Sequence, residues 1–386
     1  MQFQLYAEDE STLLAKKNLD CKKNQQVRIG KQAFVNLISI DFSDALPLDT
    51  LLAYNFILTA DSQQHSLVDC LPEILYPEQK YPNFAIKKDI KQMLHGSCRK
   101  PHFDSGDGLV QVDHVIAESV NNVTTRPAML MMSGDQIYAD DVAGPMLVAI
   151  HQVIELLGLY DEQWQGTLVN SSEELFSSPF CYYQRDQLLP HDSANKAVYD
   201  KIFAASKKPI FTSVNSKNHL ITLAEVFAMY LLTWSPIMWR FVDIKADKMA
   251  GEFLATFQAE ATIIDRFING LQPVSRALAH IPSYMIFDDH DITDDWNLTR
   301  GWEEAAYGHP FSKRIIGNTL IGYWLCQGWG NAPDKFTDLN DNVEQYFSAD
   351  SYQLQDELVD KILAWDQWHY SLATTPKIIV LDTRTQ

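Results

Sequence analysis

The sequence predicts an α/β protein with a parallel sheet flanked by helices on both faces, an N-terminal β-sandwich and a helical insertion. Residues 1–85 show period-two alternation between turn-forming residues, which is typical of short antiparallel strands. From residue 86 onward, short apolar runs alternate with helical patterns, as in a β-α-β fold. A long helical stretch, about 144–280, then separates two of the apolar runs. We therefore expect a sandwich over 1–85 and a second domain over 86–386.

The prediction of an N-terminal sandwich depends on the period-two alternation of side chains within residues 51–58, where one set is expected to face inward. Gly30, Asp44 and Pro47 separate this run from its neighbours and are typical turn formers. Three prolines between residues 72 and 82 then mark a linker.

The second domain begins with an expected strand at 90–94, a helix at 110–120 and a strand at 128–132. This order predicts two parallel strands joined by a crossover helix. The insertion at about 144–280 is then interpreted as a lid over the site, or alternatively as a separate helical domain. Within it, a helix is expected to end near Gly270, with Pro273 beyond the end.

The final part of the chain contains a strand at 284–287, followed by two long helical patterns. These patterns predict helices over 311–329 and 352–372. An apolar run at 377–381 predicts a last strand, which leads to Arg384.

Charge and composition exclude several functional classes. The net charge of -19 argues against nucleic-acid binding, which needs a basic face. The N-terminus has no pattern of a secretory signal, so a cytoplasmic location is expected. The apolar window 221–239 contains Glu225 and Pro236 and predicts a buried helix rather than a membrane span. The five cysteines are far apart and predict neither a disulfide framework nor a structural zinc site.

Two acidic clusters carry the chemistry, at residues 134–141 and 288–295. Each follows an apolar run that predicts a buried strand. The carboxyl ends of parallel strands meet at one edge of a sheet, where ligands bind. Carboxylates at such an edge, together with tyrosine and histidine, predict a site for metal ions.

In the first cluster, Asp135 and Tyr138 are spaced so that both side chains can face one ion. A phenol loses its proton readily only beside a strong Lewis acid, so a tyrosine ligand favours ferric iron. Cys98, after the preceding strand, would add a thiolate. The alternative is that Tyr138 is a half-buried aromatic residue and Cys98 a core thiol.

In the second cluster, adjacent carboxylates repel each other unless a cation compensates them. Asp289 would be the ligand, and His290 would contact or protonate a substrate oxygen. Asp288 or Asp291 would orient His290. The alternative is a solvated acidic loop that caps a helix.

Two such sites fit a dinuclear centre, which clamps an oxyanion and lowers the pKa of bound water. Phosphate esters are the expected substrates. Arg99 and Arg384 would contact phosphoryl oxygens, and surface salt bridges are the alternative for both.

Four motifs resemble the PhoD-type alkaline phosphatases, which are metallophosphoesterases related to the purple acid phosphatases. The motifs are Gly-Asp-x-x-Tyr at 134–138, Asp-Asp-His-Asp at 288–291, Gly-Ser-Cys at 96–98 and Leu-Asp-x-Arg at 381–384. They occur in order from about residue 90 to the end. The N-terminal segment is also similar to the small sandwich that many of these proteins carry.

The resemblance implies a four-layer αββα core that holds iron and a second divalent ion. Calcium is the expected second ion, with magnesium, manganese or zinc as the alternatives. It implies that Asp135 bridges the ions, that Tyr138 and Cys98 bind iron, that Asp289 is a metal ligand and that His290 is catalytic.

The chain departs from the family pattern in two places. Asp295 lies where some relatives have asparagine, and it is a candidate additional ligand together with Asp382. The family has further Asp and His motifs after the Leu-Asp-x-Arg segment, whereas nothing follows Gln386. The resemblance therefore implies either the first part of a longer protein or a divergent member.

The leading hypothesis is a phosphoesterase that hydrolyses phosphodiesters, phosphomonoesters or both by attack of a metal-activated water or hydroxide. The alternative is a non-catalytic protein that binds a partner or a glycan on a degenerate phosphoesterase scaffold. Another kind of metal hydrolase ranks lower, because a zinc peptidase relies on His and Glu rather than on Asp-x-x-Tyr and Cys.

Overall fold

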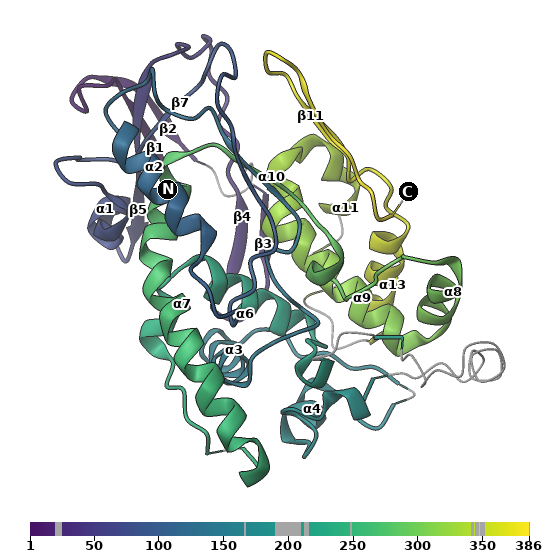
Figure 1. The fold of residues 1–386 in the computed structure, drawn as a ribbon. Coiled ribbons are helices and arrows are strands. Elements are labelled where there is room, and N and C mark those ends of the chain that lie inside the picture. The colour runs from purple at the N-terminus through teal and green to yellow at the C-terminus, as the bar shows by residue number, and fades with distance from the viewer. Residues whose placement is uncertain are drawn as a thin grey trace.

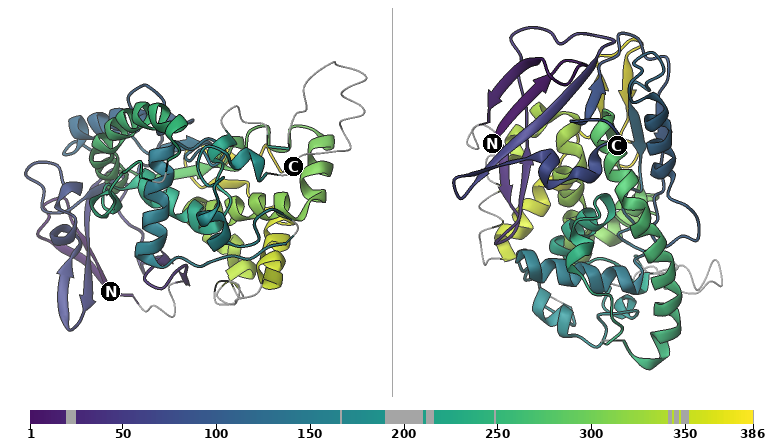
Figure 2. Two further views of the ribbon diagram at one scale, coloured as in Figure 1. Left: turned by 90° about the horizontal axis from the view of Figure 1, so that it is seen from below. Right: turned by 90° about the vertical axis from the view of Figure 1, so that its left-hand side faces the viewer.

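The computed structural model describes residues 1–19, 25–165, 167–189, 210–211, 216–247, 249–340, 343, 347 and 352–385. The chain is a mixed α/β protein in which strands and helices form one body (Figure 1). The largest N-terminal sheet lies on one side, and helices make up much of the rest of the molecule (Figure 2).

The N-terminal segment forms an antiparallel sheet in the order β2-β1-β5-β6, with β7 also beside β5. Its strands are β1 (Gln2–Tyr6), β2 (Leu13–Asn18), β5 (Leu51–Ala60), β6 (Gln63–Ser66) and β7 (Asn83–Ala85). Phe3, Leu5 and Leu52 are buried on its inner face, as the period-two alternation predicts.

A separate hairpin, β3 (Gln25–Arg28) with β4 (Phe34–Leu37), completes the N-terminal strands. Val27 and Ile29 join the largest hydrophobic core together with helices of the insertion. Ile29 also accepts a hydrogen bond from the backbone of Tyr160 at 3.4 Å. This hairpin is therefore anchored to the helical part of the chain. The division at residue 85, where β7 ends, remains our proposal.

A three-stranded parallel sheet with the order β10-β9-β8 lies at the centre of the second part. Its strands are β8 (Leu94–Gly96), β9 (Leu130–Ser133) and β10 (Ser283–Ile286). Helix α2 (Gly108–Ser119) connects β8 to β9, so the predicted β-α-β order is present. Strand β8 starts later than the expected strand at 90–94.

The two faces of this central sheet are covered by different kinds of structure. On one face, Leu130 and Met132 pack against α2 and the long helix α7 (Leu254–His280). On the other face, Met131 packs against an antiparallel hairpin of β11 (Tyr370–Leu372) and β12 (Ile378–Val380). The expectation of helices on both faces is therefore wrong, because the hairpin supplies the apolar cover that a helix would otherwise provide.

The expected helix over 352–372 is also too long. Helix α13 (Tyr352–Leu363) ends earlier, and the following residues form β11. Tyr370 and Leu372 are buried while Ser371 is exposed, which is the alternation of a strand. The hydroxyl of Tyr370 donates to the carbonyl of Met285 at 2.7 Å and so ties the hairpin to β10.

Helices make up most of the remaining structure. In the part of the chain that the structure describes, the other α-helices are α1 (Leu67–Cys70), α3 (Gly144–Leu157), α4 (Ser172–Ser177), α6 (Leu223–Trp234), α8 (Arg300–Gly308), α9 (Pro310–Tyr323), α10 (Trp329–Asn331) and α11 (Thr337–Asn340). A π-helix spans Trp324–Gly328, and 3₁₀ turns span Pro72–Ile74, Arg185–Gln187, Ser216–Asn218, Met238–Phe241, Gly251–Phe253, Asp289–Asp291 and Pro333–Phe336.

Helix α6 starts at the predicted capping box. The hydroxyl of Thr222 accepts from the backbone of Glu225 at 3.1 Å, and Glu225 accepts from the backbone of Thr222 at 3.0 Å. The helix is buried almost all round, because it packs between α3 and α9. Among the described residues, no helix has the length and apolar character needed to cross a membrane.

Helix α7 continues through the predicted stop at Gly270 and Pro273. It does so because residues on both sides of the proline are buried, including Leu271, Val274 and Ala277. The gain from burying this stripe outweighs the one backbone hydrogen bond that a proline removes. A Cβ at position 270 would lie 3.2 Å from a methyl carbon of Val110, so glycine here allows α7 to approach α2 closely.

The end of α7 is tied to the N-terminal segment through a buried histidine. The Nδ1 atom of His280 accepts from the backbone nitrogen of Asn83 at 3.2 Å, and its Nε2 faces the carbonyl of Ile74 at 3.0 Å. Because Nδ1 accepts, the ring must be neutral with its proton on Nε2. Burial lowers the pKa of His280 to about 3.

This histidine predicts a loss of stability in mild acid. Below pH 6.5 the unfolded chain binds a proton at His280, and the folded chain does not until the pH approaches 3. The free energy of unfolding should therefore fall by about 1.4 kcal/mol per pH unit over this window from His280 alone. Urea unfolding at pH 7.5 and 5.0 measures the slope, which should be smaller in His280→Gln. Equal slopes in the two proteins would contradict the assignment.

Candidate metal centre

The site lies where the three parallel strands end. Cys98 follows β8, Asp135 follows β9 and Asp289 follows β10. The strands are in register, with Ile286 of β10 opposite Ser133 of β9, so the loops that follow leave the same edge of the sheet. The structure thus places these residues at one sheet edge, as we expected from the sequence.

Three carboxylates form an acidic cluster at this edge. One oxygen from each of Asp135, Asp288 and Asp289 lies within 4.8 Å of the others. Burial, with smaller contributions from the charges of Asp288 and Asp289, raises the pKa of Asp135 to about 6 against the opposing effects of Cys98 and His290. A carboxylate in such surroundings is stabilised in its charged form by a bound cation.

Gly134 allows the two acidic loops to approach. Its φ is +98°, and a Cβ at this position would lie 2.3 Å from the Cβ of Asp288. Asp135 is also left-handed, with φ +54°. A side chain at position 134 would therefore push the two loops apart, and the acidic cluster depends on glycine there.

Asp291 connects the two loops through backbone hydrogen bonds and is fully buried. Its carboxylate accepts from the backbone nitrogens of Asp135 at 2.7 Å, Gln136 at 3.0 Å, Ile137 at 3.2 Å and Asp288 at 3.1 Å. Burial and the charge of Asp135 raise its pKa to about 7, whereas these backbone donors lower it. Asp291 therefore holds the turn that presents Asp135.

Cys98 and Tyr138 lie beside the acidic cluster. The Sγ atom of Cys98 lies 3.2 Å from Oδ2 of Asp135. Burial raises the pKa of the Cys98 thiol. Burial and the negative charge of Asp135 raise the pKa of Tyr138 as well. In the absence of a cation both groups are therefore protonated.

His290 is held by a buried aspartate. Its Nδ1 lies 2.8 Å from Oδ2 of Asp140, whose side chain is fully buried. Burial alone would lower the pKa of His290, but Asp140, with smaller contributions from Asp135 and Asp289, raises it to about 9. The ring stacks on that of Tyr138, with centroids 4.5 Å apart. The partner of His290 is thus Asp140 rather than Asp288 or Asp291.

Asp140 is the residue that our sequence analysis missed. It lies in the first acidic cluster, five residues after Asp135, so the cluster contained the signal. One of its carboxylate oxygens is buried and accepts no hydrogen bond from the described residues. The other oxygen contacts Nδ1 of His290 and keeps the ring charged and oriented.

Arg384 lies directly on the acidic cluster. Its Nε donates to Oδ1 of Asp288 at 2.5 Å, and its Nη2 lies 3.0 Å from Oδ1 of Asp289. The carboxylate of Asp382 accepts from the backbone nitrogens of Arg384 and Thr385, at 2.9 and 3.0 Å. Asp382 thus forms the turn that places Arg384.

Asp295 lies near the cluster through its backbone. Its φ is +61°, and its backbone nitrogen lies 3.3 Å from Oδ2 of Asp289. This contact supports Asp289. A role of the Asp295 or Asp382 carboxylate as an additional ligand remains a proposal.

Arg99 points into the protein. Its guanidinium bonds to Asp107 at 2.7 and 2.9 Å, donates to the carbonyl of Thr233 and lies 4.9 Å over the ring of Phe267. The preceding Cys98 has φ +59°, which turns the chain at this point. Arg99 therefore packs between the loop that carries Asp107 and helix α7. This position differs from the expected contact with a phosphoryl group.

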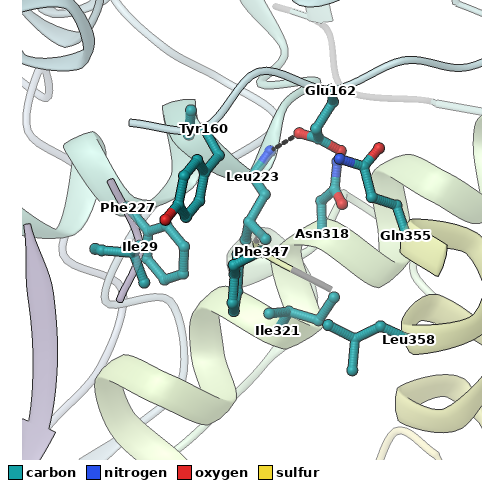
Figure 3. Close-up of a pocket in the computed structure, with 11 residues that line it drawn as sticks. Ile29, Tyr160, Glu162, Leu223, Phe227, Asn318, Ile321, Phe347, Gln355 and Leu358 are labelled. Carbon is teal, nitrogen blue, oxygen red and sulfur yellow. Dashed lines mark hydrogen bonds between the residues drawn. The ribbon is translucent and has the colours of Figure 1, made fainter. Parts of the chain in front are cut away.

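A small pocket of about 30 Å³ lies in the helical part and is lined mainly by apolar side chains (Figure 3). Glu162 is the charged residue in its wall. Its carboxylate accepts from the backbone of Leu223 at 2.5 Å and from the amide of Asn318 at 2.9 Å, and Arg314 lies 3.3 Å away. These bonds satisfy Glu162, so the cavity is a packing feature.

No family model and no curated protein matches the sequence. A solved structure described as "Structure of PhoD" is similar, with a TM-score of 0.32 and 10% sequence identity. The similarity covers 83% of this chain and 38% of that chain, so this chain spans well under half of that length. A distant likeness of this size does not assign the chain to a family.

Proposed function

We propose that the protein is a metal-dependent phosphoesterase whose acidic cluster binds the metal. The observation that supports this most is the convergence of Asp135, Asp288 and Asp289, whose oxygens lie within 4.8 Å of one another at the strand ends. Cys98 and Tyr138 border the same point.

The donor set fits the ions that the sequence predicts. Carboxylate oxygens suit calcium and other hard cations, and a phenol and a thiol beside them suit ferric iron. Asp135, Tyr138 and Cys98 would hold the iron, and Asp135 and Asp289 would hold the second ion. When bound, such ions supply Lewis-acid chemistry and an activated water for attack at phosphorus.

The chain's own residues supply proton transfer and charge. With its pKa raised to about 9, His290 is protonated at neutral pH and can give a proton to the leaving alcohol oxygen. Asp140 fixes the ring through Nδ1, so Nε2 carries the proton that is transferred. Arg384, beside Asp288 and Asp289, would neutralise phosphoryl charge at the same edge.

The direct test is elemental analysis of the protein purified without chelator, combined with hydrolysis of bis(p-nitrophenyl) phosphate. Iron with a second ion, and turnover that a chelator abolishes, are the expected results. A metal-free protein that still binds a partner or a glycan would instead support the non-catalytic alternative.

His290→Gln should keep its metal and lose turnover. The His290 side chain acts as a proton donor and not as a metal ligand, so the metal content should stay close to that of the wild type. Loss of general acid catalysis should lower kcat by ~10² to 10⁴-fold. His114→Gln, at an exposed position of α2, is the matched control. A loss of metal in His290→Gln, or an unchanged kcat, would contradict this role.

Tyr138→Phe should abolish a visible absorption band in the iron-loaded protein. A tyrosinate bound to ferric iron absorbs visible light by charge transfer, and phenylalanine cannot form that bond. Tyr284→Phe, on β10, should keep the band. If the iron-loaded protein is colourless, or if Tyr138→Phe keeps the band, Tyr138 is a packing residue.

A further inference from the structure

A cleft of about 1130 Å³ opens beside the acidic cluster. One wall is the segment from His95 to Val112, which includes the first turns of α2, and the opposite wall is α7 from Ile263 to Gly270. Tyr138 and His290 also line it, so it reaches the proposed reacting groups. Its size suits a ligand of several hundred cubic ångströms or more.

The walls of this cleft are largely apolar. Phe103 is exposed and Val110, Val112 and Ile263 are half-buried, whereas the lining residues Leu109, Leu130, Met132 and Phe267 are buried in the walls. Phe103 is 62% exposed, although large aromatic side chains are usually buried. An open apolar surface that continues into a site with polar groups is typical of a ligand-binding cleft.

The cations of the cleft are already paired with carboxylates. Arg99 bonds to Asp107 at 2.7 Å, and Arg266 lies 2.5 Å from Asp104. Lys100 is paired with Asp141. A strongly anionic group would have to break these pairs to bind along the cleft, whereas an apolar group would not.

We propose that this cleft binds a large apolar alcohol arm, aryl or alkyl, of the phosphate ester. This inference rests on the proposed phosphoesterase function and specifies its substrate class. The phosphate lies at the acidic cluster and His290, and the apolar arm lies between the segment 103–109 and α7. Nucleotides and sugar phosphates, whose alcohol parts are polar, are disfavoured because they would desolvate polar groups without replacement bonds.

The test compares the binding of two phosphonates, 1-naphthylphosphonate and methylphosphonate, to the metal-loaded protein by calorimetry. Both compounds carry the same charged group, so the ratio of their Kd values measures the contribution of the apolar arm to binding. The naphthyl compound should bind ~10-fold tighter or more, because removing even small apolar groups from a pocket costs about that much.

Two variants place a charge in the cleft. Ile263→Glu lies on α7, and Phe103→Asp lies on the exposed loop, where the substitution leaves the core intact. Both should bring the ratio of Kd values toward one. Thr262→Glu, adjacent on α7 and exposed, adds the same charge outside the cleft and should keep the preference.

The outcomes separate this inference from the function on which it rests. Equal Kd values in the wild type, or a preference that survives both cleft variants, would overturn the inference, as would failure of both compounds to bind. A naphthyl preference that the cleft variants remove supports the inference. If that preference occurs in a protein that does not hydrolyse phosphate esters, the cleft assignment holds and the catalytic proposal fails.

Discussion

Asp135→Asn should lose most of its bound metal and lower phosphoesterase turnover by at least ~100-fold. Removing a residue that merely supports a ligand commonly costs 10–100-fold in affinity or activity, and Asp135 is the proposed ligand shared by both ions. Asparagine is the informative substitution because it tolerates the left-handed φ of +54° at this position. The turn is preserved, and the charge is removed.

The measurement is metal content together with hydrolysis of bis(p-nitrophenyl) phosphate under a fixed metal supply. Asp265→Asn, at an exposed position of α7, makes the same chemical change away from the site and should behave like the wild type. Full metal content in Asp135→Asn would show that the acidic cluster is not the metal site.

Asp291→Asn should lower the free energy of unfolding by roughly 2–5 kcal/mol. The carboxylate accepts from four backbone nitrogens of two loops while fully buried. An amide can accept through its oxygen, but its NH₂ group then faces backbone donors and leaves them without acceptors. Metal affinity should fall as well, because these two loops carry Asp135 and Asp288.

Urea unfolding of the wild type, Asp291→Asn and the exposed control Asp265→Asn measures this effect at one pH. The control should change stability by less than ~0.5 kcal/mol, as surface substitutions usually do. A change equally small in Asp291→Asn would show that the loops are held by other contacts.

The main features of the site could be predicted from local sequence patterns. The apolar runs before residues 134 and 288 predict strands, and the β-α-β order predicts that their carboxyl ends share an edge, which the register of β9 and β10 confirms. Thr222 and Glu225 form the capping box that their spacing predicts. These features depend on residues that are close in sequence, or on the general geometry of parallel sheets.

Side-chain partners could not be predicted in the same way. His290 pairs with Asp140, which lies 150 positions earlier, and Arg384 pairs with Asp288 across 96 positions. Arg99 turns inward toward Asp107 and Thr233 rather than to the site. No local pattern encodes such pairs, because they depend on how separate loops approach in space.

By itself, the sequence determined which residue types gather at the strand ends, since hydrophobic periodicity places strands and polar turns follow them. Only the tertiary structure decided what each side chain does there. Left-handed residues such as Cys98 and Asp135 change the direction of the chain within one residue, and the close approach at Gly134 sets the distance between loops. The hairpin β11–β12 covers the sheet where helices were expected, because any element with a matching apolar face can bury that surface.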